Sequence, residues 1–200
     1  MTRQAAPGAA AWRLAALLLA TASGAAGAQS VEYALDPTHS SVTFEVLHFD
    51  TATIRGRFSM LNGTVQWDRS AGRGRVQVVI DTASVSTGVP VLDAVLRRDD
   101  LLASGPHPQA FFVAEQFSSG ADGAVQAVAG EFTLRGSSRG LRLQAQRFRC
   151  YTHPLLRREV CGGDFEATLP RSAFGITHSL PFVADTVRLL VQVEAIRQTP

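Results

Sequence analysis

Hydrophobic residues recur at every second position over short segments of this chain, and that spacing most constrains its fold. Side chains two residues apart lie on one face of a β-strand, so each such segment has an apolar face. The pattern is clearest near the C-terminus, in the row Val187, Leu189, Val191, Val193 and Ala195. A second row is formed by Val42, Phe44, Val46 and His48. Both rows predict half-buried antiparallel strands.

Turn residues separate these segments. Asn62-Gly63 is a strong hairpin signal and predicts a turn between strands over Ile54–Leu61 and Thr64–Asp68. The glycine-containing stretch Arg69–Gly74 predicts a second turn, which leads into the alternating residues Val76, Val78 and Ile80. Further strands are predicted over Ala110–Phe117, Ala124–Arg135, Leu141–Cys150 and Gly163–Leu169.

One segment, Pro90–Ala103, has a helical pattern instead. Pro90 suits the first turn of a helix, and Leu92, Val95 and Leu96 form a stripe at positions i, i+3 and i+4. Many strands with one short helix indicate an all-β sandwich or barrel. The phenylalanines of these strands then either pack into a solid core or line a ligand cavity.

The N-terminus has the order of a secretory signal peptide. Arg3 and Arg13 precede the apolar run Leu14–Ala20, and the small residues Ala26-Gly27-Ala28 follow. A transmembrane anchor is the alternative, but it needs about 20 apolar residues and this run is shorter. We therefore predict a signal peptide over residues 1–28, cleaved after Ala28, and one domain over residues 29–200. No other segment is long enough to span a membrane.

The charge balance argues against a nucleic-acid partner. The chain has 19 basic and 17 acidic residues. Two of the arginines and none of the acids lie in residues 1–28, so 17 basic and 17 acidic residues remain. A nucleic-acid-binding protein normally has a basic surface, and this balance predicts none. Nothing in the sequence specifies an oligomeric state.

The two cysteines, Cys150 and Cys161, both lie in the predicted exported part. An exported protein reaches a compartment that permits disulfides, and these two residues lack the CxxC spacing of redox or metal pairs. We predict a structural disulfide that joins two strands, with a stabilising effect of about 3 kcal/mol or slightly less for so short a loop.

The sequence lacks the usual patterns of enzymes and metal sites. The five histidines are scattered, without HExxH spacing, and no glycine-rich phosphate loop is present. Gly136–Gly140 has G-x-S-x-G spacing but lies between two predicted strands, whereas the nucleophile elbow of a serine hydrolase joins a strand to a helix. The adjacent Asp99 and Asp100 point in different directions on a helix and suit a solvated surface better than a pair of catalytic carboxylates. We therefore predict no catalytic residues, no metal site, no cofactor and no enzymatic activity.

Four segments, in order along the chain, resemble the YceI-like family, which comprises secreted bacterial proteins that bind polyisoprenoids. Asp36–His48 matches the pattern D-x-x-H-S-x-V-x-F-x-V-x-H. Leu96–Phe112 is similar to a helix end followed by P-x-A-x-F at a strand start. Gly130–Gly136 and Arg171–Gly175 are similar to the family's G-x-L-T-L-x-G hairpin and R-S-x-F-G motif.

This resemblance implies a single antiparallel eight-stranded lipocalin-like barrel with the short helix closing one end. It also implies that the lumen binds a long polyprenyl lipid or an isoprenoid quinone, and the signal peptide then implies a periplasmic location. We expect the lumen to be lined by Phe44, Val46, Phe58, Phe112, Phe132 and Phe174, with Val95, Leu96 and Leu101 closing one end. A barrel filled by its own side chains, acting as an interaction partner in a stress response, is a third hypothesis.

The polar end of the ligand is expected to contact His48 and Arg97, because a guanidinium suits phosphate and an imidazole can donate to a carbonyl. Arg97 has an alternative partner in Asp93, one turn back on the helix. His39 is expected to stabilise a turn rather than bind a ligand. An enzyme that uses His48 and Arg97 on a lipid-linked or quinone substrate is the second functional hypothesis.

Overall fold

The computed structural model describes residues 1–2, 4 and 30–198 of the chain. The predicted signal peptide falls almost wholly outside these described residues and stays a prediction. No helix among the described residues is long and apolar enough to cross a membrane.

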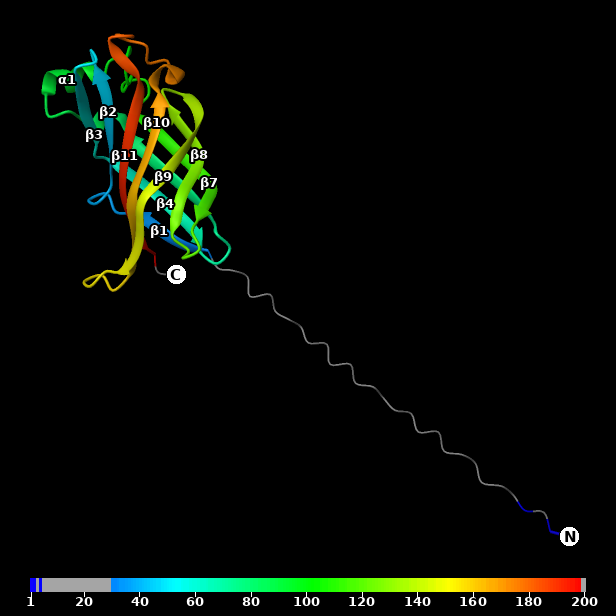
Figure 1. The fold of residues 1–200 in the computed structure, drawn as a ribbon. Coiled ribbons are helices and arrows are strands. Elements are labelled where there is room, and N and C mark those ends of the chain that lie inside the picture. The colour runs from blue at the N-terminus through cyan, green and yellow to red at the C-terminus, as the bar shows by residue number, and fades with distance from the viewer. Residues whose placement is uncertain (3, 5–29, 199–200) are drawn as a thin grey trace.

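The described part of the chain forms eleven strands, one α-helix and two short 3-10 helices (Figure 1). The strands are β1 (Val31–Leu35), β2 (Ser41–His48), β3 (Ala52–Phe58), β4 (Leu61–Asp68), β5 (Arg73–Asp81), β6 (Val85–Ser86), β7 (Gln109–Ser119), β8 (Val125–Leu134), β9 (Ser137–Thr152), β10 (Glu159–Pro170) and β11 (Val183–Arg197). The helices are η1 (Thr82–Ser84), α1 (Pro90–Leu96) and η2 (Arg171–Phe174).

Eight of the strands close into an antiparallel barrel, as predicted. Their order is β1, β4, β5, β7, β8, β9, β10 and β11, and the ring closes where β1 pairs with β11. The helix α1 lies at one end of this barrel (Figure 1). Closure pairs the backbone of each strand on both sides, so the inward-facing side chains enclose a common interior.

The first strand of the barrel breaks into β1 and β2, and both halves pair with β11. Leu35 of β1 lies opposite Ala195, whereas Val42 of β2 lies opposite Val191. From β2 the sheet continues into β3 and β6 instead of β4. The barrel wall therefore splits toward the end where α1 lies, and α1 contacts β6 there.

A hydrogen-bonded turn occupies the break. The Asp36 carboxylate accepts hydrogen bonds from the Thr38 backbone at 2.9 Å and from its hydroxyl at 2.6 Å. It also lies 2.7 Å from Nδ1 of His39. The predicted turn-stabilising role of His39 is thus confirmed, and the conspicuous Asp36–Ser40 segment of the sequence is explained by the break.

The hairpin predicted at Asn62-Gly63 is wrong. Both residues lie within β4, opposite Val79 and Val78 of β5, and β3 pairs with β2 and β6 rather than β4. Gly63 serves a close approach between strands: a Cβ atom there would lie 2.4 Å from the carbonyl oxygen of Gln77. A glycine required by a ladder and a glycine required by a turn look alike in sequence.

The helix is also shorter than predicted. Pro90 stands in its first turn as expected, but α1 ends at Leu96 rather than at Ala103. The following residues form consecutive turns in which the Ala103 backbone has a positive φ of 51° and donates to the Arg98 carbonyl at 2.8 Å. This left-handed conformation cannot continue an α-helix.

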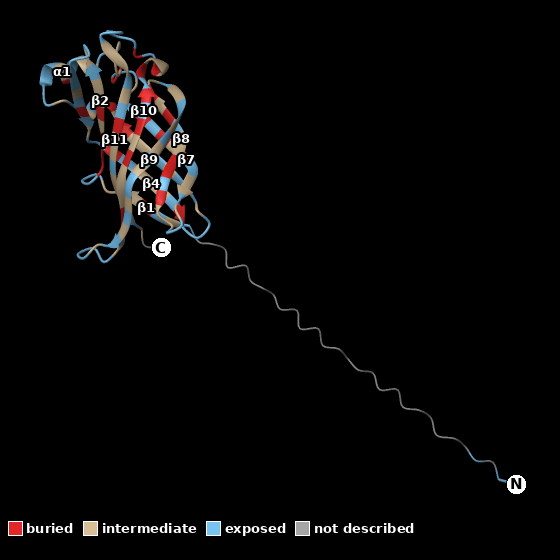
Figure 2. Ribbon diagram, in the orientation of Figure 1, coloured by how far each residue is buried: buried red, intermediate tan, exposed pale blue. Residues whose placement is uncertain are grey.

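The other long predicted strands are present, and the predicted disulfide is confirmed. Cys150 of β9 lies opposite Cys161 of β10, and their sulfur atoms are bonded. Buried residues run in rows along the strands of the barrel (Figure 2). The bond therefore ties together two strands of the wall, near the end of the barrel opposite α1.

We predict that Gly63→Ala destabilises the fold by about 2 kcal/mol, because the new Cβ would collide with the backbone of β5. Gly140→Ala is the matched control, since a Cβ at Gly140 would contact nothing within 4 Å. We expect the control to change the free energy of unfolding by less than about 0.5 kcal/mol. Urea denaturation measures both variants, and equal effects would contradict the assignment of Gly63 to the β4–β5 ladder.

The turn at the strand break predicts a pH dependence. Hydrogen bonds from His39 and Thr38 lower the pKa of Asp36 to about 2, and Asp36 raises the pKa of His39 above its usual 6.5. The His39 contribution is complete below pH 6.5 and is lost as pH rises through the raised pKa, whereas that of Asp36 is lost below its unfolded pKa of 3.8. His39→Gln should therefore lower the free energy of unfolding at about pH 5 but change it little at about pH 9. Urea denaturation at the two pH values measures this. Equal losses at both would argue against an ion pair between His39 and Asp36.

Candidate functional site

The interior of the barrel holds a cavity of about 420 Å³, within the usual range for small-molecule sites. Eight of the nine residues predicted for the lumen line it: Phe44, Val46, Phe58, Val95, Leu96, Leu101, Phe112 and Phe132. The sequence pattern alone therefore located most of the wall. Their part in binding a ligand stays a prediction.

The barrel is hollow along much of its length. Val187, Val191 and Val193 of β11 point into the cavity, yet each is only half-buried. In a filled barrel such inward-facing side chains would be packed on all sides. The open space beside them argues against the alternative in which the phenylalanines fill the lumen.

Phe174 does not line the cavity, contrary to the prediction. It lies in η2, is only 3% exposed, and packs edge-on against Phe132 with ring centroids 5.5 Å apart. Phe174 is therefore part of the buried core and supports the lining residue Phe132 without lining the cavity itself.

The cavity opens at the end where the loop between η2 and β11 lies. His178 and Ser179 of this loop are the exposed members of the lining, and His48, at the end of β2, is half-buried beside them. Nδ1 of His178 lies 2.9 Å from the Asp100 carboxylate, which also accepts from Arg98 at 2.9 Å. The opening therefore has polar groups, whereas the lumen beyond it is mostly apolar.

Arg97 takes no part in this polar opening, so its predicted place beside His48 is wrong. Its guanidinium donates to the carbonyl oxygens of Ala83 and Val85, both at 2.9 Å, and Arg97 is absent from the cavity lining. Its alternative partner, Asp93, is buried and accepts from Thr87 instead. Arg97 thus fixes the segment before α1, and His178 rather than Arg97 lies in the cavity lining beside His48.

A buried arginine holds the loop at the opening in place. Arg171 is 6% exposed and donates to the carbonyl oxygens of Ile176, His178, Val183 and Ala184, at 2.7 to 3.1 Å. Burial lowers the pKa of Arg171, and the nearby Asp185 carboxylate opposes that change. In the sequence Arg171 stands out only as part of a motif, because four backbone acceptors, two in the loop after η2 and two at the start of β11, leave no pattern there.

The other end of the cavity is closed by buried aromatic and polar residues. The Tyr33 hydroxyl donates to Glu159 at 2.9 Å, and burial together with this hydrogen bond raises the pKa of Tyr33 to about 12. Arg69 lies over the ring of Trp67, 4.9 Å from its centroid, and donates to Glu159 at 3.1 Å. These contacts join β1, β4 and β10 below the lumen.

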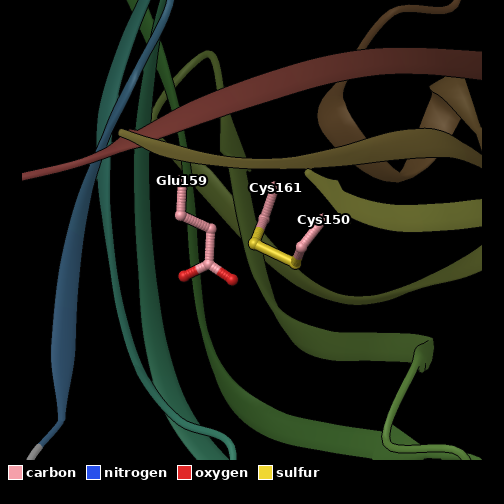
Figure 3. A group of neighbouring side chains, drawn as sticks. All are labelled: Cys150, Glu159 and Cys161. Atoms are coloured by element: carbon pink, nitrogen blue, oxygen red, sulfur yellow. A yellow bond between two sulfur atoms is a disulfide. The ribbon is translucent and has the colours of Figure 1, made fainter. Parts of the chain in front are cut away.

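Cys150, Glu159 and Cys161 gather at this closed end in an arrangement that resembles a metal site (Figure 3). Their ligand atoms lie within 4.8 Å of one another. Because the two sulfur atoms are bonded to each other, neither is a thiolate that can bind a metal. The group is therefore a structural disulfide beside the Glu159 carboxylate, which accepts hydrogen bonds from Tyr33 and Arg69.

Comparison with known proteins identifies the family. A family model for the YceI-like domain matches residues 33–195. The chain belongs to the YceI-like family. A UPF0312 protein of Pseudomonas paraeruginosa is 31% identical over 189 residues, which cover 92% of this chain and 97% of that protein. The family match thus spans nearly the whole of the barrel.

Solved structures of YceI-like proteins show the same fold. A Campylobacter jejuni YCEI protein superposes with a TM-score of 0.65 at 21% identity, over 76% of this chain and 90% of that one. A polyisoprenoid binding domain from Saccharophagus degradans gives 0.62 at 19% identity, over 84% and 99%. At these identities the likeness concerns the fold.

We predict that Arg171→Gln destabilises the protein by about 3 kcal/mol, because several buried carbonyl groups lose their donor. The control is Arg147→Gln, which removes an exposed guanidinium that pairs with Asp164 at 3.3 Å. An exposed pair contributes at most about 1 kcal/mol. Urea denaturation compares the two, and a loss for Arg171→Gln no larger than the control would contradict the anchoring role.

Proposed function

We propose that this YceI-like protein binds a long-chain polyisoprenoid lipid or an isoprenoid quinone in its barrel, and that it carries or sequesters this ligand in the periplasm without chemical turnover. The hollow apolar lumen with a polar opening is the observation that carries the proposal. The Saccharophagus degradans neighbour, described as a polyisoprenoid binding domain, supports the same ligand class.

The chemistry of the lining favours such a ligand because recognition there depends on area and shape. Each buried CH₂-sized group contributes about 0.8 kcal/mol, so one five-carbon prenyl unit contributes about 4 kcal/mol before entropy is lost. A charge-assisted hydrogen bond at the opening adds only about 1.5–3 kcal/mol. The tail therefore dominates affinity, and the headgroup sets the orientation of the ligand.

The polar end of the ligand is assigned to the opening, next to His48, His178 and Ser179. Both imidazoles can donate or accept a hydrogen bond, and the hydroxyl can do either. His178 is oriented through Nδ1 by Asp100, which leaves its other ring nitrogen for the headgroup. A quinone carbonyl, an alcohol or a phosphate oxygen suits these donors.

Filling the lumen tests the proposal. Val191→Phe adds a ring inside the cavity, whereas Leu190→Phe adds the same ring type on the outer face of β11 and is the matched control. We expect Val191→Phe to weaken binding of a polyprenol at least about tenfold, because the ring occupies space the tail needs. Titration with a polyprenol delivered from cyclodextrin measures the affinity.

Stability of the same variants separates a hollow barrel from a filled one. In a hollow barrel Val191→Phe costs little, whereas overpacking a solid core costs about 1–3 kcal/mol. Unchanged polyprenol affinity in Val191→Phe, or a wild-type protein that binds neither polyprenol nor isoprenoid quinone, would overturn the proposal. Turnover of a bound quinone or lipid that is lost in His48→Ala would instead favour an enzyme.

A further inference from the structure

Two phenylalanines project into solvent at the open end of the barrel. Phe49 and Phe182 are 55% and 59% exposed, and their rings stack with centroids 5.2 Å apart and planes 20° from parallel. The Phe49 backbone N–H donates to the Phe182 carbonyl at 2.7 Å, so the pair is fixed by the fold. Large exposed aromatic pairs are unusual on a free surface and mark contact sites.

The backbone conformation at Phe49 is unfavourable for a bulky side chain. Phe49 and Asp50 have φ values of 50° and 52°, and the Thr51 N–H donates to the His48 carbonyl across them at 3.1 Å. Phe49 and Asp50 are thus the central residues of a β-turn in the three-residue connection between β2 and β3, and both have positive φ. Asparagine and glycine suit such positions, whereas a bulky side chain there is strained.

The aromatic pair is continuous with the opening of the cavity. His48, next to Phe49, lines the cavity, and so do Ser179 and Val183 on the segment that carries Phe182. Val183 also pairs with His48 across β2 and β11. A surface that covers the two rings therefore also covers the opening through which a ligand enters.

The charges around the opening indicate what kind of surface this is. Arg98, Asp100 and His178 form a mutually paired group. Asp50 and Asp99 form no ion pair with any described residue. These charged side chains are therefore mixed in sign and do not themselves form the basic cluster that attracts anionic lipids.

We propose that Phe49 and Phe182 dock the protein on a phospholipid bilayer without net charge, with the rings in the interfacial region and the cavity opening against the membrane. Aromatic residues are favoured in that region, where binding strength follows buried apolar area. This inference deepens the proposed function and rests on it for the ligand. A long isoprenoid tail leaves a bilayer at high cost in water, and docking lets it pass directly into the lumen.

Flotation with phosphatidylcholine vesicles tests the docking surface. The full chain is used throughout, so every variant has the same N-terminal segment and only differences between variants are compared. We expect Phe49→Asn and Phe182→Ser each to lower vesicle binding about tenfold, because each removes one inserted ring. Asparagine suits the turn, so Phe49→Asn should fold at least as well as the wild type.

Leu155→Ser is the matched control. Leu155 is 86% exposed, in the loop between β9 and β10 at the other end of the barrel (Figure 1). The Leu155→Ser variant should bind vesicles as the wild type does. Vesicle binding of the wild type should change little between low and high salt. Binding that requires anionic lipid and disappears in salt, or that is lost in Leu155→Ser but kept in Phe49→Asn, would overturn the proposal. Self-association through Phe49 without vesicle binding would overturn it in favour of a second copy of the chain.

Two variants keep this inference distinguishable from the proposed function. Phe49→Asn should still bind polyprenol delivered from cyclodextrin but take it up from vesicles about tenfold more slowly. Val191→Phe should bind vesicles normally while losing polyprenol. If Phe49→Asn instead takes up polyprenol from vesicles at the wild-type rate, the docking surface is wrong and the lumen assignment stands.

Discussion

The pairing of one long strand with two halves of a broken strand determines the shape of this barrel. β11 pairs with β1 near its C-terminal end and with β2 farther back. Because β1 continues to β4 and β2 to β3, the sheet is closed at one end and split at the other. The turn at Asp36 that separates the halves therefore decides where a ligand can enter. Backbone pairing is continuous around the closed end, whereas loops shape the split end.

A hollow interior lowers the stability of the barrel, because side chains that face it lack packing partners. Inward-facing valines of β11 that are half-buried lose packing partners and remain partly accessible. The Tyr33–Glu159 contact at the closed end joins strands far apart in sequence, while the disulfide and the Arg171 contacts join neighbouring elements of the wall. These contacts stabilise the barrel from outside the lumen, so the interior can stay apolar and unfilled. The tail of the proposed ligand can then pack against the inward-facing side chains.

Period-two rows and cysteine placement could be read directly from the sequence. Val187 to Ala195 alternate strictly, because one face of β11 meets the lumen, and Cys150 and Cys161 lie in adjacent strands. Signals that serve two purposes failed: Gly63 was needed for a close approach within a ladder, although Asn-Gly is also a turn signal. Irregular backbone was least predictable, since the contacts of Arg97 and the position of His178 depend on loops with no periodicity.

The two ends of the cavity differ in a way that follows from these constraints. At the closed end, strands from distant parts of the sequence meet, and Tyr33, Arg69 and Glu159 satisfy one another. At the open end, His48 and His178 line the cavity, and Phe49 and Phe182 retain exposed apolar area. An end whose charged groups pair with one another serves the fold. An end that keeps polar and apolar groups available, at the cost of a strained turn, is the one suited to meet a ligand and its membrane.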